Sequence, residues 1–196
     1  MTWDEYEHLS DEELDELLEP ASVAPRPNDM FDTMALMLLE AGVIAEDELD
    51  SLLDTGMPEM PEDVSDQDRA QLIAFEAYDV CFDDPDLARE MADEAIEIDE
   101  LCLDARVARW FTFDIDSEDA LTAAGTAAIM GREMVKRSGE FREYDDVWMY
   151  PRMRGAVRGY AALAETNWAH GDKKHAIEAA RETLDMAPDD PLRVVP

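Results

Sequence analysis

RGYAALAETNWAHGDKKHAIEAARETLDMAPDD, residues 158–190, is the most informative stretch of this chain. Its apolar residues recur every three or four positions, which is typical of amphipathic helices. The segment His170 to Asp172 interrupts this pattern and includes Gly171, which can adopt the positive φ of a tight turn. Pro188 then prevents further helix. The stretch therefore predicts two antiparallel helices joined by a short turn.

The side chains of this stretch resemble those of a tetratricopeptide repeat. The positions that match are the large aromatic residue, the Leu-Gly pair, the small residues of the second helix, the turn and the closing proline: Tyr160, Leu163, Ala164, Ala176, Ala180, Gly171 and Pro188. Small side chains are needed where two helix backbones cross closely, and a bulky one fills the groove between them. The resemblance extends over roughly residues 68–191.

The same register continues upstream into two further candidate pairs. Their small residues are Ala88, Ala92 and Ala95 in the first pair, and Ala120, Ala124 and Ala127 in the second. The register departs from the family pattern at four positions, which are Glu76, Glu100, Arg132 and Thr183. The resemblance implies a short bacterial-type array of antiparallel helix pairs with a right-handed superhelical twist, occupying residues 64–196.

Helix is expected throughout, because Leu, Ala, Met, Glu and Arg dominate the chain and strand-like alternation is missing. One helix is expected from Asp66 or Asp68 to about Phe82, and the helix that contains Ala120 is expected to run on through IMGREMVKRSG. Breaks are expected at Asp83–Pro85, Asp99–Leu101, Asp114–Ser117, Ser138–Glu143 and His170–Asp172. The predicted fold class is therefore all-α.

Two segments precede the predicted array. Residues 1–27 read as an acidic, flexible segment with a short amphipathic helix, ended by prolines, and residues 28–56 read as a helical hairpin. The net charge is −34, and residues 1–100 hold 33 acids against only Arg26, Arg69 and Arg89. Five apolar side chains of the first segment favour an interaction element that folds on docking: Trp3, Tyr6, Leu14, Leu17 and Leu18. A solubilising arm is the alternative.

No pattern in the chain predicts catalysis, a cofactor or a metal. The only histidines are His8, His170 and His175, and none is spaced with Glu or Cys as a metal site requires. Gly125 and Gly131 do not form a phosphate-binding loop, because no Lys-Ser or Lys-Thr follows them. Cys81 and Cys102 are expected to be small core hydrophobes. We therefore expect a protein that is not an enzyme.

A basic island lies between Gly131 and Gly159, and its arginines stand beside aromatic residues. Such arginines can hold a carboxylate or stack on a partner side chain. Neutralising the neighbouring acidic helices is the alternative role. With the groove register that the resemblance implies, the expected partner-binding residues are Arg109, Arg154, Arg158, Glu165 and Trp168. Trp168 has a core position as its alternative.

These features favour a cytoplasmic adaptor that binds a protein or peptide. The sequence indicates neither the identity of this partner nor the oligomeric state of the adaptor. The longest apolar run, Met34 to Leu39, is too short to cross a bilayer. The acidic charge disfavours direct contact with nucleic acid or an anionic membrane. An acidic mimic of nucleic acid, occupying the basic cleft of a DNA- or RNA-binding protein, is the alternative function.

Overall fold

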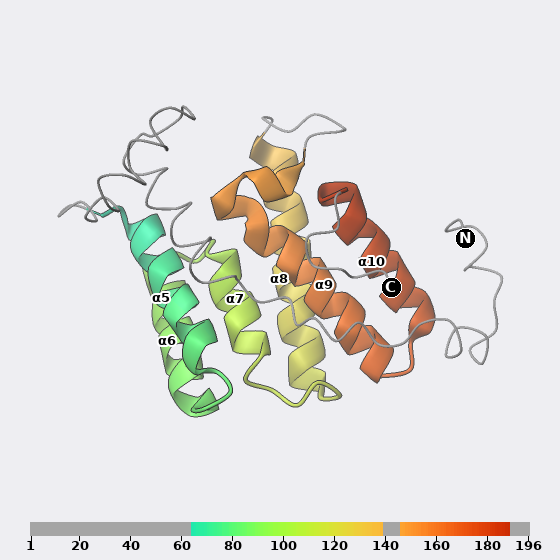
Figure 1. The fold of residues 1–196 in the computed structure, drawn as a ribbon, viewed down its shortest axis with the longest axis horizontal. Helices are drawn as coiled ribbons and strands as arrows, with labels where there is room; N and C mark the ends of the chain where they lie inside the picture. Colours follow the sequence, from blue (N-terminus) through green and yellow to red (C-terminus); the bar gives the residue numbers. More distant parts are fainter. Residues whose placement is uncertain (1–63, 139–145, 189–196) are drawn as a thin grey trace, which may run out of the picture.

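The computed structural model describes residues 64–138 and 146–188. Every regular element in this part of the chain is a helix, which confirms the all-α class for these residues (Figure 1). The α-helices are α5 (Asp66–Val80), α6 (Pro85–Ile98), α7 (Leu103–Trp110), α8 (Glu118–Ser138), α9 (Arg154–Ala169) and α10 (Lys173–Met186). Two short 3₁₀ helices precede α9, and they are η1 (Val147–Met149) and η2 (Pro151–Met153).

Side chains at the predicted breaks start the helices. The carboxylate of Asp84 accepts a hydrogen bond from the Leu87 amide (3.1 Å), and Asp172 accepts one from the His175 amide (3.3 Å). The hydroxyl of Ser117 caps α8 in the same way, by accepting from the Ala120 amide (3.1 Å). Gly171 has a φ of 77°, so the predicted left-handed turn between α9 and α10 is confirmed.

Two predicted helix ends compare directly with the structure. The first helix begins at Asp66, one of the two expected starts, and ends at Val80, two residues before Phe82. Helix α8 continues to Ser138, as the uninterrupted pattern predicted. The predicted segments 1–27 and 28–56, including the apolar residues of the first, and most of the predicted break after Ser138 lie outside the described residues.

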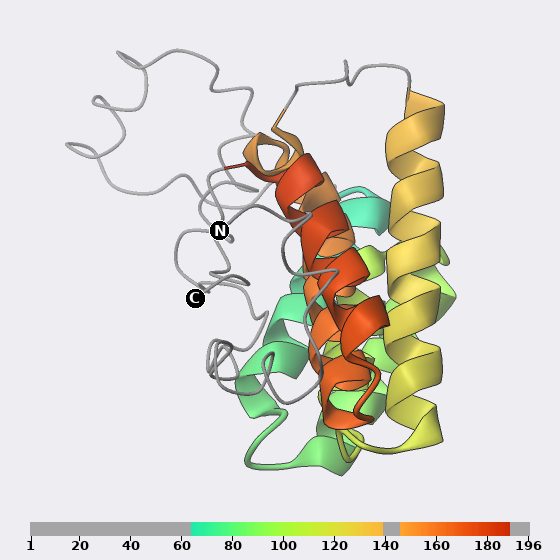
Figure 2. The same cartoon turned by 90° about the vertical axis from the view of Figure 1, so that its right-hand side faces the viewer.

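The six α-helices pack in the order in which they occur. Each contacts the next along the chain, and α7 also lies between α5 and α9 (Figure 1). Helices α9 and α10 run in opposite directions, and the turns α5–α6, α7–α8 and α9–α10 all lie at one end of the molecule. Helix α8 forms one edge in Figure 2. The central helix, α7, is therefore the most enclosed.

Small residues occupy the helix crossings. The alanines that the repeat register assigned to the second helix of each pair are all buried, with at most 8% exposure: Ala88, Ala92, Ala95, Ala120, Ala124, Ala127, Ala176 and Ala180. Cys81 and Cys102 are free and buried, and burial raises the pKa of the Cys102 thiol to about 12. Both cysteines thus occupy the core positions expected of small hydrophobes.

Two glycines allow α9 to approach its neighbours most closely. A Cβ atom at Gly131 of α8 would lie 2.7 Å from the Cα of Ala156 on α9. A Cβ atom at Gly155 of α9 would lie 2.6 Å from the Cβ of Leu103 on α7. Real side chains do not tolerate such distances, so either position requires glycine as long as the helices keep this spacing.

We predict opposite effects of alanine at two glycines of the same helix. Gly131→Ala forces α8 and α9 apart and should lower the free energy of unfolding by about 1–3 kcal/mol, despite the better helix propensity of alanine. Gly125→Ala enters open space and should raise it by about 0.4–1 kcal/mol. Urea denaturation followed by circular dichroism measures both. Equal shifts in the two variants would contradict the close α8–α9 contact.

Candidate functional site

Arg158 lies in the core and not on a groove surface, which corrects the position expected from the repeat register. Its side chain on α9 has no exposed area, and neither has that of Asp104 on α7. The two groups form an ion pair in which Arg158 Nη1 donates to Asp104 Oδ1 at 2.7 Å. An Arg158 guanidinium held in this way is not available to a partner in this structure.

Two further buried side chains complete the surroundings of Asp104. Gln71 Nε2 donates to Asp104 Oδ2 at 2.6 Å, and the Tyr78 hydroxyl donates to Asp104 Oδ1 at 3.3 Å. Burial, reinforced by the Asp104 charge, holds the pKa of Tyr78 well above its ordinary value, so this hydroxyl stays a donor. We call Gln71, Tyr78, Asp104 and Arg158 the buried polar cluster; it joins α5, α7 and α9.

Trp148 links the basic island to this cluster. The guanidinium carbons of Arg158 and Arg154 lie 5.0 Å and 5.4 Å from its ring centroid, within the range of cation–π interactions. Arg154 Nε also donates to the Trp148 carbonyl at 2.8 Å. The structure therefore brings Arg154, Arg158 and Trp148 together, and Arg154 serves to hold η1 against α9.

A second buried carboxylate is paired with another arginine of the island. Asp68, at the start of α5, has no exposed area and accepts two hydrogen bonds from Arg152 of η2, from Nε at 2.9 Å and from Nη2 at 3.0 Å. Such bidentate geometry gives a strong, directional ion pair. Arg152 and Arg158 thus neutralise acids of α5 and α7, which is the alternative role that the sequence left open.

Arg109 points toward α6. Its side chain is 43% exposed, and Nε lies 3.2 Å from Asp93 Oδ1. Its guanidinium carbon lies 6.0 Å from the centre of the Phe113 ring, so the α7–α8 connection also borders it. Arg109 and Arg158 were expected in one groove, but the structure gives them different carboxylate partners on different helices.

Glu165 and Trp168 share a face of α9, because they are three residues apart on one helix. Both side chains are half-buried, and Lys173 Nζ of α10 lies 5.6 Å from the Trp168 ring centroid. Burial raises the pKa of Glu165 to about 7, and no cation or donor in the described part of the chain offsets it. We call Glu165 and Trp168, together with the neighbouring Lys173 of α10, the α9 surface.

The burial of two acidic side chains was not predicted from the sequence. Asp104 and Asp68 are two of 50 acidic residues, and neither belongs to a motif that would distinguish it from a solvated one. The available signal for Asp104 was its position in LDARVARW, where apolar residues surround it in a short helix. Its partner Arg158 is 54 residues away in the chain, so local pattern could not pair them.

Comparison with protein-family models, with curated proteins and with solved structures finds no match to this chain. Among the described residues, no helix combines the length and the apolar character that a membrane span requires. In the same part of the chain, no three His, Cys, Asp or Glu side chains are grouped as metal ligands. The assignment of a function therefore depends on the geometry of the helices and their surfaces.

We predict that Glu165 makes stability depend on pH. Its pKa is about 4.5 when unfolded and about 7 when folded, so the native state binds more protons between these values. Stability should fall as the pH rises from about 4.5 to about 7 and then level off. Near pH 8, the free energy of unfolding of Glu165→Gln should exceed that of the wild type by about 1–3 kcal/mol, so its urea midpoint should be higher. Near pH 4.5 the two proteins should not differ.

Glu178→Gln provides the matched control, because Glu178 is exposed on the neighbouring helix α10. Its urea midpoint should follow that of the wild type at both pH values. An equal response of the two variants to pH would show that burial does not set the titration of Glu165.

Proposed function

We propose that this chain is a non-enzymatic adaptor that binds another polypeptide through a short tetratricopeptide-like helical array. The observation that carries the proposal is the packing order of the helices. Helix α5 contacts α6 and α7, helix α7 contacts α6, α8 and α9, and helix α9 contacts α8 and α10. Stacked helix pairs of a repeat protein have this order, in which the first helix of each pair touches the first helix of the next.

The residues at the helix contacts support the same proposal. Three buried side chains, Tyr78, Trp110 and Thr166, recur near the ends of α5, α7 and α9. The indole nitrogen of Trp110 donates to Thr166 Oγ1 at 2.8 Å and fixes α7 against α9 at this level. A right-handed twist, and a groove along the first helices of the pairs, are the finer parts of the proposal.

The proposed contact region includes the α9 surface. Trp168 offers a large aromatic face, and tryptophan is enriched among the residues that contribute most to protein interfaces. Glu165 is a half-buried carboxylate that gains from any cation brought to it, because burial now opposes its charge. The proposed partner therefore presents a lysine or arginine beside an apolar side chain. The proposal requires no cofactor and retains the cytoplasm as its setting.

Affinity capture with matched variants tests this proposal. The full chain serves as bait in a cell lysate, next to a Glu165→Lys, Trp168→Ala double variant and the control Lys174→Glu, whose side chain is 81% exposed on α10. We expect mass spectrometry to find a polypeptide that the wild type and the control retain and that the double variant loses by about tenfold or more.

Two outcomes would contradict the proposal. Equal retention of every captured protein by the double variant would exclude the α9 surface as the binding region. Capture of DNA- or RNA-binding proteins alone, equally by all variants and abolished by high salt, would favour the acidic mimic instead.

A further inference from the structure

An aromatic surface lies at the end of the molecule where the α5–α6 and α7–α8 connections meet. From it we infer a second binding site, which takes an arginine-containing segment of another polypeptide on the rings of Phe82 and Phe111, beside the Phe113 ring that the chain's own Arg89 and Arg109 contact. We call these three phenylalanines the turn surface. This second site goes beyond the adaptor proposal, because its residues differ from those of the α9 surface.

The rings of the turn surface rest on the core. Phe82 is 63% exposed, and its ring meets that of Phe111 edge-on with centroids 5.9 Å apart. Phe111 in turn meets the ring of Tyr78 at 5.6 Å and that of Trp110 at 4.6 Å. The exposed phenyl group of Phe82 therefore packs on a set of rings that the buried polar cluster and α7 hold in place.

Carboxylates border these rings. Residues 82–86 hold three acids and residues 113–119 hold four, and neither segment contains Lys or Arg. Four of these side chains lie in the connections themselves and are exposed: Asp83, Asp84, Asp114 and Asp116. Asp86 is exposed in the first turn of α6. An aromatic surface bordered by carboxylates complements a cation with a flat apolar face, and it repels phosphate and acidic peptides.

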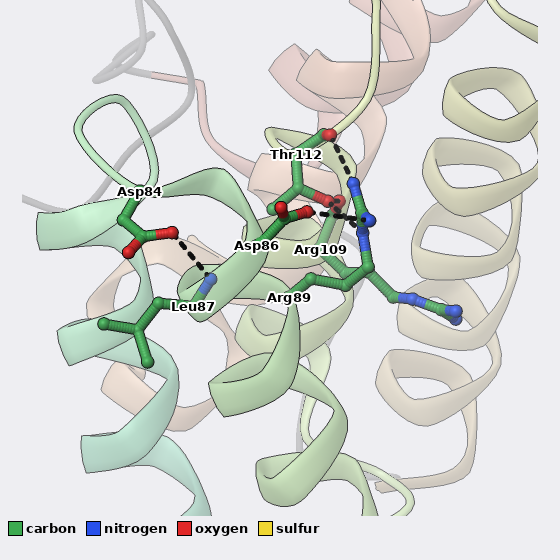
Figure 3. A network of polar contacts seen from close by, with 6 residues as sticks. All are labelled: Asp84, Asp86, Leu87, Arg89, Arg109 and Thr112. Atoms are coloured by element: carbon green, nitrogen blue, oxygen red, sulfur yellow. Dashed lines mark hydrogen bonds and ion pairs between the residues drawn. The ribbon is translucent and has the colours of Figure 1, made fainter.

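The chain itself already binds an arginine at this end by this chemistry. The guanidinium carbon of Arg89 lies 5.2 Å from the Phe113 centroid, and Nη1 lies 3.4 Å from the Asp86 carboxylate. Figure 3 shows the same guanidinium donating to the Thr112 carbonyl, at 2.9 Å from Nη2, while Nε donates to the Thr112 hydroxyl at 3.2 Å. One arginine is thus held by a ring, a carboxylate and a carbonyl together.

Phe82 and Phe111 offer the corresponding groups to an arginine from outside. Asp83 and Asp84 follow Phe82 directly, and the carboxylate of Asp84 is held at the start of α6 by its hydrogen bond from the Leu87 amide. Arginine suits this arrangement better than lysine, because a planar guanidinium stacks on a ring while it donates to a carboxylate. The site should therefore distinguish arginine from lysine at equal charge.

Fluorescence anisotropy with labelled octa-arginine and octa-lysine tests this inference on the full chain at about 0.15 M salt, where long-range attraction is screened beyond about 8 Å. We expect octa-arginine to bind the wild type about tenfold more tightly than octa-lysine, and Phe82→Ser to remove most of that difference. This variant leaves the net charge of −34 unchanged, so it isolates the contribution of the ring.

Ile129→Ser is the matched control, because Ile129 is 65% exposed on α8, away from both connections. It should bind both peptides like the wild type. A second variant, Asp83→Asn with Asp116→Asn, should weaken octa-arginine severalfold and leaves the rings intact. Equal affinity for the two peptides, or octa-arginine binding that Phe82→Ser does not weaken, would overturn the inference.

The two proposed sites can fail independently. The Glu165→Lys, Trp168→Ala variant should keep its preference for octa-arginine over octa-lysine even if it loses the captured partner. Loss of that preference in this variant would assign the arginine site to the α9 surface and overturn the separate turn surface.

Discussion

The ion pair of Asp104 with Arg158 constrains the rest of the structure. Both side chains are fully buried, and burying an unpaired charge costs several kcal/mol or more. The charges are acceptable only while the two groups stay in contact. Gln71 and Tyr78 also donate hydrogen bonds to the Asp104 carboxylate. Because the partners lie on α5, α7 and α9, these three helices can pack in few other ways.

Close helix packing and the buried polar cluster depend on each other. The absence of side chains at Gly131 and Gly155 allows α9 to approach α8 and α7, and that approach brings Arg158 within 2.7 Å of Asp104. On its other side, Arg158 faces the ring of Trp148, which Arg154 also contacts. Trp148 and Arg154 of the basic island thus pack next to a buried charge.

Local sequence information predicted the elements well and the ion pairs poorly. Helix starts depend on nearby residues such as Asp84, Ser117 and Asp172, and the buried alanines follow from helical periodicity, so both were predictable. The partners of Arg158 and Arg152 lie 54 and 84 residues away, and their choice depends on how separate helices stack. The position of Arg158 was wrong for this reason, because the register assigned a face to it without knowing of Asp104.

The same distinction applies to the proposed binding surfaces. Glu165 and Trp168 were selected from the register, and the structure adds that burial opposes the charge of Glu165. The turn surface was not expected, since Phe82 and Phe111 are 29 positions apart and only the packing of α5 against α7 brings their rings into contact. Both surfaces depend on α7 and α9 being held in place by the buried polar cluster.

A double-mutant cycle on Asp104 and Arg158 tests that dependence most directly. Urea unfolding is measured for Asp104→Leu, Arg158→Met and the double variant. Each single change leaves one buried charge without its partner and should lower the free energy of unfolding by about 3–5 kcal/mol. The double variant should lose at least about 2 kcal/mol less than the sum of the two. Additive losses of under about 1 kcal/mol each would contradict the view that this pair holds the helices together.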